Sequence, residues 1–156
     1  IFNKGKLTLS VNPFIPKPAT PFQWAAFENT ETLEKRLAII KKGLQKIPGI
    51  EIKATRPKEA LFQAYVSRAD TRAGELIYEA SQKSVRHVLK KHAAFITESV
   101  GRQREKDEPL PWDIIDHGVR KTYLWQEYRK GLEALETTPC EVGGCFRCGV
   151  CYGSSN

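Results

Sequence analysis

Four cysteines near the end of the chain are the residues best suited to chemistry. They form a C-x4-C-x2-C-x2-C arrangement and are the only cysteines in the sequence: Cys140, Cys145, Cys148 and Cys151. Two-residue spacings let successive thiolates converge on one centre, and the tight turns this needs are permitted by three glycines: Gly143, Gly144 and Gly149. The alternative is two disulfides or four unrelated thiols. Clustering in a chain without a secretory signal favours a metal site.

The spacing also bears on which metal the thiolates would hold. Zinc sites usually combine two C-x2-C pairs that are about a dozen or more residues apart. A continuous C-x2-C-x2-C run is closer to the ligand run of a [4Fe–4S] ferredoxin. We therefore expect an iron–sulfur cluster, with zinc as the alternative. A cluster would carry electrons or offer an iron with an open coordination position, whereas a closed zinc site would mainly cross-link the C-terminal segment.

The histidines carry a weaker signal. His87 and His92 are five residues apart, which does not match the i, i+4 pairing of a helical metal site. His117 follows Asp113 and Asp116, and this group could do acid–base work. We favour capping and turn chemistry at the start of a helix for these three residues.

The first third of the chain has the pattern of a βα unit. Residues 6–12 alternate apolar and polar side chains as a strand does, and a proline-rich loop follows to Trp24. Leucines and isoleucines then recur every three or four residues from Leu33 to Ile47, which predicts an amphipathic helix over residues 29–47, capped by Asn29 or Thr30. Ile50–Ala54 reads as a second strand. We expect the two strands to be parallel because a helix connects them.

The rest of the chain is predicted to be mainly helical, with helices opened by Pro57, Asp70 and Ser84 and a last helix from Val119 to about Glu136. Three charged residues mark the junction before the second of these helices: Arg68, Asp70 and Arg72. We favour a salt-linked turn, with Asp70 as a helix cap; the alternative is contact with a substrate or cofactor.

Composition limits the classes of function. The 156 residues carry a net charge of +7, which suits an acidic partner such as RNA, but the basic residues fall on solvated helix faces, so we do not favour nucleic-acid binding. No apolar run approaches the roughly 20 residues that span a bilayer. We expect a cytoplasmic protein without a membrane partner. A start at Ile1 without methionine predicts a piece of a longer polypeptide.

Four stretches together resemble one family, the radical S-adenosylmethionine (SAM) proteins that carry a B12-binding-like domain before the barrel and a cysteine-containing extension behind it. The stretches occur in the family's order and span most of the chain: Leu9 to Trp24, Ser67 to Arg72, Leu110 to Val119, and the cysteine run. One departure is Ala69, where the family tends towards glycine.

The resemblance implies an α/β fold in three segments: residues 1–54 as the last βα unit of a partial (β/α)6 barrel, 55–136 as a helical extension, and 137–156 as a cysteine-rich metal-binding tail. It places Asn12, Pro13 and Phe14 where the family's backbone approaches the SAM adenine. The parent enzyme would use SAM, with cobalamin a further cofactor to consider, and the partner of this section would be the upstream half of the same polypeptide. The family's C-x3-C-x2-C motif is absent, so this section is not expected to cleave SAM alone. The alternative is a non-catalytic RNA- or protein-binding module with a structural zinc.

Overall fold

The computed structural model describes residues 5–141 and 144–151. This part of the chain divides into two compact units, which are described separately here. Of the described residues, the first unit contains 5–15 and 26–102, and the second contains 16–25, 103–141 and 144–151. This division follows contacts in space. The predicted segment boundaries, after residues 54 and 136, follow the sequence pattern instead, and the structure does not test them.

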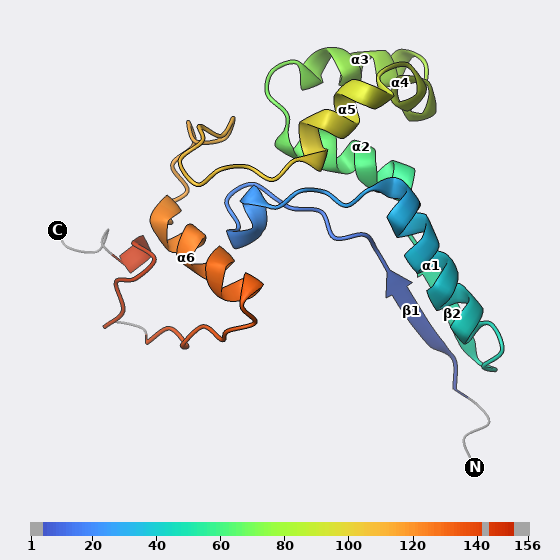
Figure 1. Cartoon of the computed structure of the whole chain (residues 1–156), viewed down its shortest axis with the longest axis horizontal. Coiled ribbons are helices and arrows are strands. Elements are labelled where there is room, and N and C mark those ends of the chain that lie inside the picture. The colour runs from blue at the N-terminus through green and yellow to red at the C-terminus, as the bar shows by residue number, and fades with distance from the viewer. Residues whose placement is uncertain (1–4, 142–143, 152–156) are drawn as a thin grey trace. The chain divides into compact units, whose positions relative to one another are not determined.

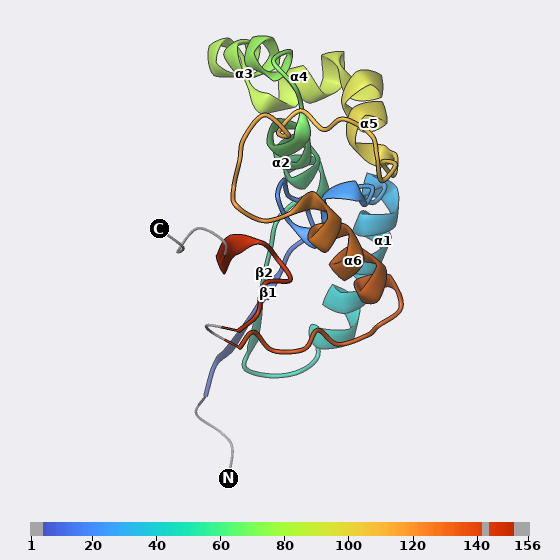
Figure 2. The same cartoon turned by 90° about the vertical axis from the view of Figure 1, so that its left-hand side faces the viewer.

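A small parallel sheet opens the first unit. Strand β1 (Leu7–Val11) pairs with β2 (Ile50–Ala54), and helix α1 (Thr30–Leu44) connects them and lies alongside the sheet (Figure 1, Figure 2). The register pairs Leu7 with Ile50 and Val11 with Ala54. The chain is therefore α/β, with a parallel βαβ unit as predicted.

Local capping explains where α1 begins and ends. The side chain of Asn29 accepts a hydrogen bond of 2.7 Å from the backbone N–H of Glu31, which confirms Asn29 as the N-cap. The helix ends at Leu44, three residues before the predicted end at Ile47. Pro48 disfavours helical backbone before it, and Gly49 turns the chain with φ of +82°. A Cβ at Gly49 would meet the carbonyl oxygen of Gly5 at 3.0 Å, so glycine suits this turn.

The apolar face of α1 is only partly covered. None of its side chains is buried, and Ile40 is 37% exposed although it lies on the predicted apolar stripe. Leu7 on β1 is 55% exposed. A sheet of two five-residue strands offers too little surface to bury a helix of 15 residues.

Four helices complete the first unit: α2 (Pro57–Arg68), α3 (Ala73–Gln82), α4 (Val85–Lys91) and α5 (Ala93–Gly101) (Figure 1). Their core includes Ala64, Tyr65, Val88 and Ile96. Pro57 begins α2, and the Ser84 hydroxyl caps α4 through the N–H of His87, both as predicted. The predicted third helix is broken at His92 into α4 and α5.

The second unit is built around aromatic side chains. The proline-rich segment contains a short 3-10 helix, η1 (Pro21–Trp24), which the loop prediction missed, and η1 packs on helix α6 (Lys121–Leu132). Trp24 is fully buried with Leu124 and Tyr128. The predicted last helix is shorter than expected, and Leu135 beyond it is 57% exposed. Among the described residues no helix is long and apolar enough to cross a membrane.

Candidate functional site

The cysteine segment is the main candidate site, and all four thiols lie in the described part of the second unit as free cysteines. They influence one another. Partial desolvation, followed by the charge of Cys145 and a hydrogen bond to it, raises the pKa of Cys140, and the charges of Cys151 and Cys148 add to this. Within residues 5–141 and 144–151, however, no three His, Cys, Asp or Glu side chains are arranged to hold a metal ion. The four thiols are therefore close enough to affect one another's charge, but in this structure their sulfur atoms do not surround one common metal position.

Arg147 ties the two ends of this segment together. Its Nε donates to the Sγ of Cys145 at 3.2 Å, and its terminal nitrogen donates to the carbonyl oxygens of Thr138 and Pro139 at 2.9 and 3.1 Å. The hydrogen bond from the Arg147 side chain, followed by one from the Arg147 backbone, lowers the pKa of Cys145 below its usual range. The segment thus already contains a cation placed beside a thiol, where it favours the ionised form.

Arg120 is a second arginine that holds the turn between Cys145 and Cys148. Its guanidinium donates to the carbonyl oxygen of Phe146 and, at 2.7 Å, to that of Arg147. Its backbone N–H donates to the carbonyl oxygen of Cys148 at 2.8 Å. Sequence reasoning missed this role because Arg120 lies far from the cysteines in the chain.

Of the three predicted turn glycines, Gly149 has the positive φ, +95°, that glycine favours. Gly144 is described and does not have a positive φ, and Gly143 lies outside the described residues. The prediction is therefore confirmed at Gly149 by the backbone geometry.

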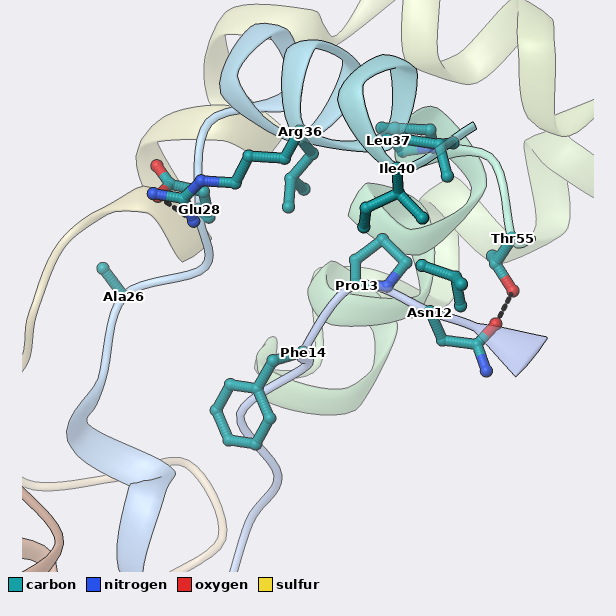
Figure 3. Close-up of a pocket in the computed structure, with 12 residues that line it drawn as sticks. Asn12, Pro13, Phe14, Ala26, Glu28, Arg36, Leu37, Ile40 and Thr55 are labelled. Carbon is teal, nitrogen blue, oxygen red and sulfur yellow. Dashed lines mark hydrogen bonds and ion pairs between the residues drawn. The ribbon is translucent and has the colours of Figure 1, made fainter. Parts of the chain in front are cut away.

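A second candidate lies at the carboxyl ends of the two parallel strands, where ligands commonly bind in open α/β sheets. A cavity of about 360 Å³ is lined there by the residues that follow β1, Asn12, Pro13 and Phe14, and by side chains of α1 (Figure 3). The structure thus places all three predicted cofactor-contacting residues on one cavity.

The walls of this cavity are apolar and its edges are polar. Pro13, Leu37 and Ile40 approach one another in Figure 3 and form an apolar wall. At one edge the Thr55 hydroxyl donates to the side-chain oxygen of Asn12 at 2.7 Å, which ties together the ends of the strands. At another edge, Arg36 and Glu28 form an ion pair of 3.2 Å. Such a cavity suits a flat, partly apolar group.

Arg68, Asp70 and Arg72 do not line this cavity. Asp70 and Arg72 pair across the turn before α3, with the Arg72 Nε to Asp70 Oδ1 distance at 3.0 Å. Hydrogen bonds from the Arg72 side chain and backbone lower the pKa of Asp70. Asp70 accepts the N–H of Arg72, which is the residue at the N-cap position, so Asp70 stabilises the turn and is not itself the cap. Ala69 has φ of −77°, so this turn needs no glycine.

Arg68 is fully buried in the last turn of α2, and its guanidinium donates to the carbonyl oxygen of Val100 at 3.4 Å. We expect Arg68→Ala to lower the free energy of unfolding by about 1 to 3 kcal/mol, because it leaves a gap at a fully buried side chain and removes one of the two hydrogen bonds to the Val100 carbonyl, which also accepts the N–H of Phe27. Urea titration measures the change. Arg72→Ala, at an exposed ion pair, is the control and should have a smaller effect. An unchanged midpoint for Arg68→Ala would contradict this structural role and favour the alternative, contact with a substrate or cofactor.

The turns before α6 are stabilised by three side chains: Asp113, Asp116 and His117. Their side chains accept backbone N–H groups of Leu110, Gly118 and Val119, respectively. Burial tends to raise the pKa of Asp113, but the hydrogen bond of 2.6 Å from Lys121, the backbone N–H of Leu110 and the charge of Lys121 together outweigh it, and the pKa is lowered. The turn interpretation is therefore confirmed, but none of the three side chains caps α6, whose N-cap residue is Arg120 and has no side-chain capping bond.

Glu79 on α3 is a charged group that the sequence did not single out. Its carboxylate lies 2.9 Å from both Lys91 Nζ and His92 Nε2, and 3.3 Å from His87 Nε2. Hydrogen bonds from Lys91 and His92 lower its pKa to about 2. The two histidines therefore meet one carboxylate from different parts of the fold, and they link α3 to α4 and the start of α5.

The depressed pKa of Glu79 makes the stability of this unit depend on pH. The contribution of Glu79 is complete above the unfolded pKa of 4.5 and is lost as the pH falls towards about 2. We expect the difference in unfolding free energy between the wild type and Glu79→Gln to shrink from about pH 5 to about pH 2. Glu75→Gln on the same helix is the control and should give a smaller change. A constant difference for Glu79→Gln would contradict the interaction.

No family model, curated protein or solved structure gives a significant match to this chain, so the functional conclusion depends on its own residues.

Proposed function

We propose that this chain is the C-terminal section of a radical SAM enzyme and that Cys140, Cys145, Cys148 and Cys151 hold an auxiliary metal centre, an iron–sulfur cluster in preference to zinc. One observation carries the metal assignment: four free thiols in a 12-residue segment influence one another, and two arginines hold the backbone between them. Four thiolates are a ligand set that both iron–sulfur clusters and zinc accept.

The residues present fit a metal centre in their charge. Bringing thiolates together is opposed by their mutual repulsion, which a bound cation relieves. Arg147 beside Cys145 already favours the ionised thiol there. When bound, an iron–sulfur cluster supplies electron transfer or an open iron, whereas zinc supplies cross-linking. The chain's own residues bind the metal and stabilise the negative charge of the thiolates.

The cavity at the strand ends supports the second part of the proposal. Asn12, Pro13 and Phe14 line it together with α1, in the position where the family resemblance expects the SAM adenine. In this proposal the apolar wall from Leu37 and Ile40 excludes water from the ring, and Asn12 orients it. The radical-generating cluster would be held elsewhere in the enzyme, because this chain lacks the C-x3-C-x2-C motif.

The incomplete burial of the βαβ unit supports a barrel partner. Leu7 on β1 and Ile40 on α1 remain exposed beside a sheet of two strands. In the proposal, further parallel strands of the same polypeptide extend this sheet, and the unit becomes the last βα unit of a partial (β/α)6 barrel. Additional strands would cover apolar surface that the described residues leave in water.

Metal identity tests the function. The chain is reconstituted anaerobically with iron and sulfide, and separately with Zn²⁺, and the bound metal is quantified. The expected result is iron and sulfide in cluster stoichiometry with absorption at about 400 nm. Tight, stoichiometric zinc with no cluster would instead support the alternative, a binding module stapled by zinc. Uptake of neither metal, or disulfides in a reduced sample, would refute the metal site.

A further inference from the structure

Three successive carbonyl groups in the cysteine turn face one arginine. The Arg120 guanidinium donates to the carbonyl oxygens of Phe146 and Arg147, and the Arg120 backbone N–H donates to that of Cys148 at 2.8 Å. Arg120 is the N-cap residue of α6, which places its backbone at the end of a regular helix in the same unit. Both guanidinium bonds come from one terminal nitrogen, Nη2, whose two N–H groups have fixed directions in the guanidinium plane, whereas a lysine ammonium has a shorter reach and rotates freely.

The direction of these carbonyls decides where the amides of the turn point. A trans peptide places its N–H opposite its C=O. The N–H groups of Arg147, Cys148 and Gly149 share peptide planes with the three captured carbonyls, so they point away from Arg120. A donor of this turn already reaches a thiol, because the Arg147 side chain donates from Nε to the Sγ of Cys145 at 3.2 Å. Amides turned to a common side make a cradle for negative charge.

The contact between Arg120 and the turn is close. A Cβ at Gly149 would meet the Cγ of Arg120 at 2.8 Å and its Nε at 3.2 Å, and the φ of +95° at Gly149 is strained for other residues. A Cβ at Gly144, in contrast, would have no atom within 4 Å. The turn is thus matched to the Arg120 side chain at Gly149 and not at Gly144.

We propose that Arg120 is the positioning residue of the metal site: by holding the carbonyls of residues 146–148 on one side, it presents the amides of the C-x2-C turn to the cysteine thiolates. The inference rests on the proposed metal site. It adds to that site a residue that orients the ligand-bearing backbone through hydrogen bonds. Arg120 acts through the backbone and does not itself bind the metal. Groups that orient metal ligands typically change metal affinity by about 10- to 100-fold when they are removed.

The test measures Zn²⁺ affinity by competition with a chromophoric chelator, in the whole chain, with Zn²⁺ as the probe. We expect Arg120→Ala to bind Zn²⁺ about 10- to 100-fold more weakly than the wild type. Arg120→Lys keeps the charge but bridges the two carbonyls poorly, so it should also be weakened. Arg129→Ala is the matched control, since Arg129 lies on α6, pairs with Glu133 at 3.2 Å, and should leave the affinity unchanged.

Substitutions in the turn provide a second measurement. Gly149→Ala is expected to weaken Zn²⁺ binding in the same direction as Arg120→Ala, whereas Gly144→Ala should bind as the wild type does. Circular dichroism of each variant checks that α6 and the other helices are intact. Arg120 is exposed, so its replacement should leave the fold unchanged.

The outcomes separate this inference from the proposed function. If the wild type binds Zn²⁺ and Arg120→Ala binds it equally well, the positioning role is refuted while the metal site stands. If Arg120→Lys matches the wild type and Arg129→Ala is weakened, general charge and not carbonyl capture governs the affinity, and the inference is again wrong. If the wild type binds neither Zn²⁺ nor iron, the metal site fails and this inference falls with it.

Discussion

Replacement of Trp24 by alanine is expected to lower the free energy of unfolding of the second unit by about 3 to 5 kcal/mol, the usual cost of removing a buried aromatic ring. Trp24 is fully buried and packs edge to face against Trp125, with ring centroids 5.0 Å apart. Its centroid also lies 6.0 Å from that of Tyr128. Because these rings belong to η1 and α6, loss of Trp24 separates the two elements that the core joins.

Urea unfolding followed by circular dichroism measures this effect, and the fluorescence of Trp112 and Trp125 reports on the second unit. Ile114→Ala is the control, since Ile114 is 91% exposed in the same unit and its replacement should change stability by no more than about 0.5 kcal/mol. Trp24→Phe keeps a ring and should fall between the two. Equal midpoints for Trp24→Ala and Ile114→Ala would contradict the assignment of this core.

Replacement of Cys148 by serine is expected to weaken metal binding by about 100-fold or more. Four thiolates share a binding free energy of about 10 to 16 kcal/mol in structural zinc sites, so the loss of one ligand is large. A serine hydroxyl stays protonated at neutral pH and cannot replace the thiolate. The same substitution should reduce iron uptake on anaerobic reconstitution.

Val150→Ser is the matched control for Cys148→Ser. Val150 lies between Cys148 and Cys151 and is 56% exposed. The substitution therefore introduces a serine hydroxyl next to Cys148 without removing a thiol. We expect its affinity for Zn²⁺ to equal that of the wild type. Similar losses in both variants would mean that the turn and not the thiolate matters, and unchanged binding in Cys148→Ser would exclude Cys148 as a ligand.

Local sequence patterns were sufficient for the βαβ unit and several helix ends. Alternation in residues 6–12 predicted β1, and the three- and four-residue repeat predicted α1, because these periods follow from the geometry of strand and helix. The caps at Asn29 and Ser84 were predictable since each bonds an N–H two or three residues away. The cysteine spacing also predicted a turn glycine at Gly149.

Burial along the helices was predicted less well. The apolar repeat of α1 led us to expect a covered face, but Ile40 is 37% exposed and Ile47 is 47% exposed. The last helix was predicted to reach Glu136 and ends at Leu132. Periodicity states which residues share a face, whereas burial requires a partner surface, and the size of that partner is a property of the tertiary structure.

The sequence by itself determined the parallel βαβ unit, the capped helix starts and the presence of four thiols at metal-binding spacing. Only the tertiary structure placed Glu79 against His92, Arg68 against the carbonyl of Val100, and Arg120 against the cysteine turn. The physical reason is distance along the chain: capping and periodicity act within a few residues, whereas these contacts join residues 13 to 32 positions apart, and no local pattern encodes them.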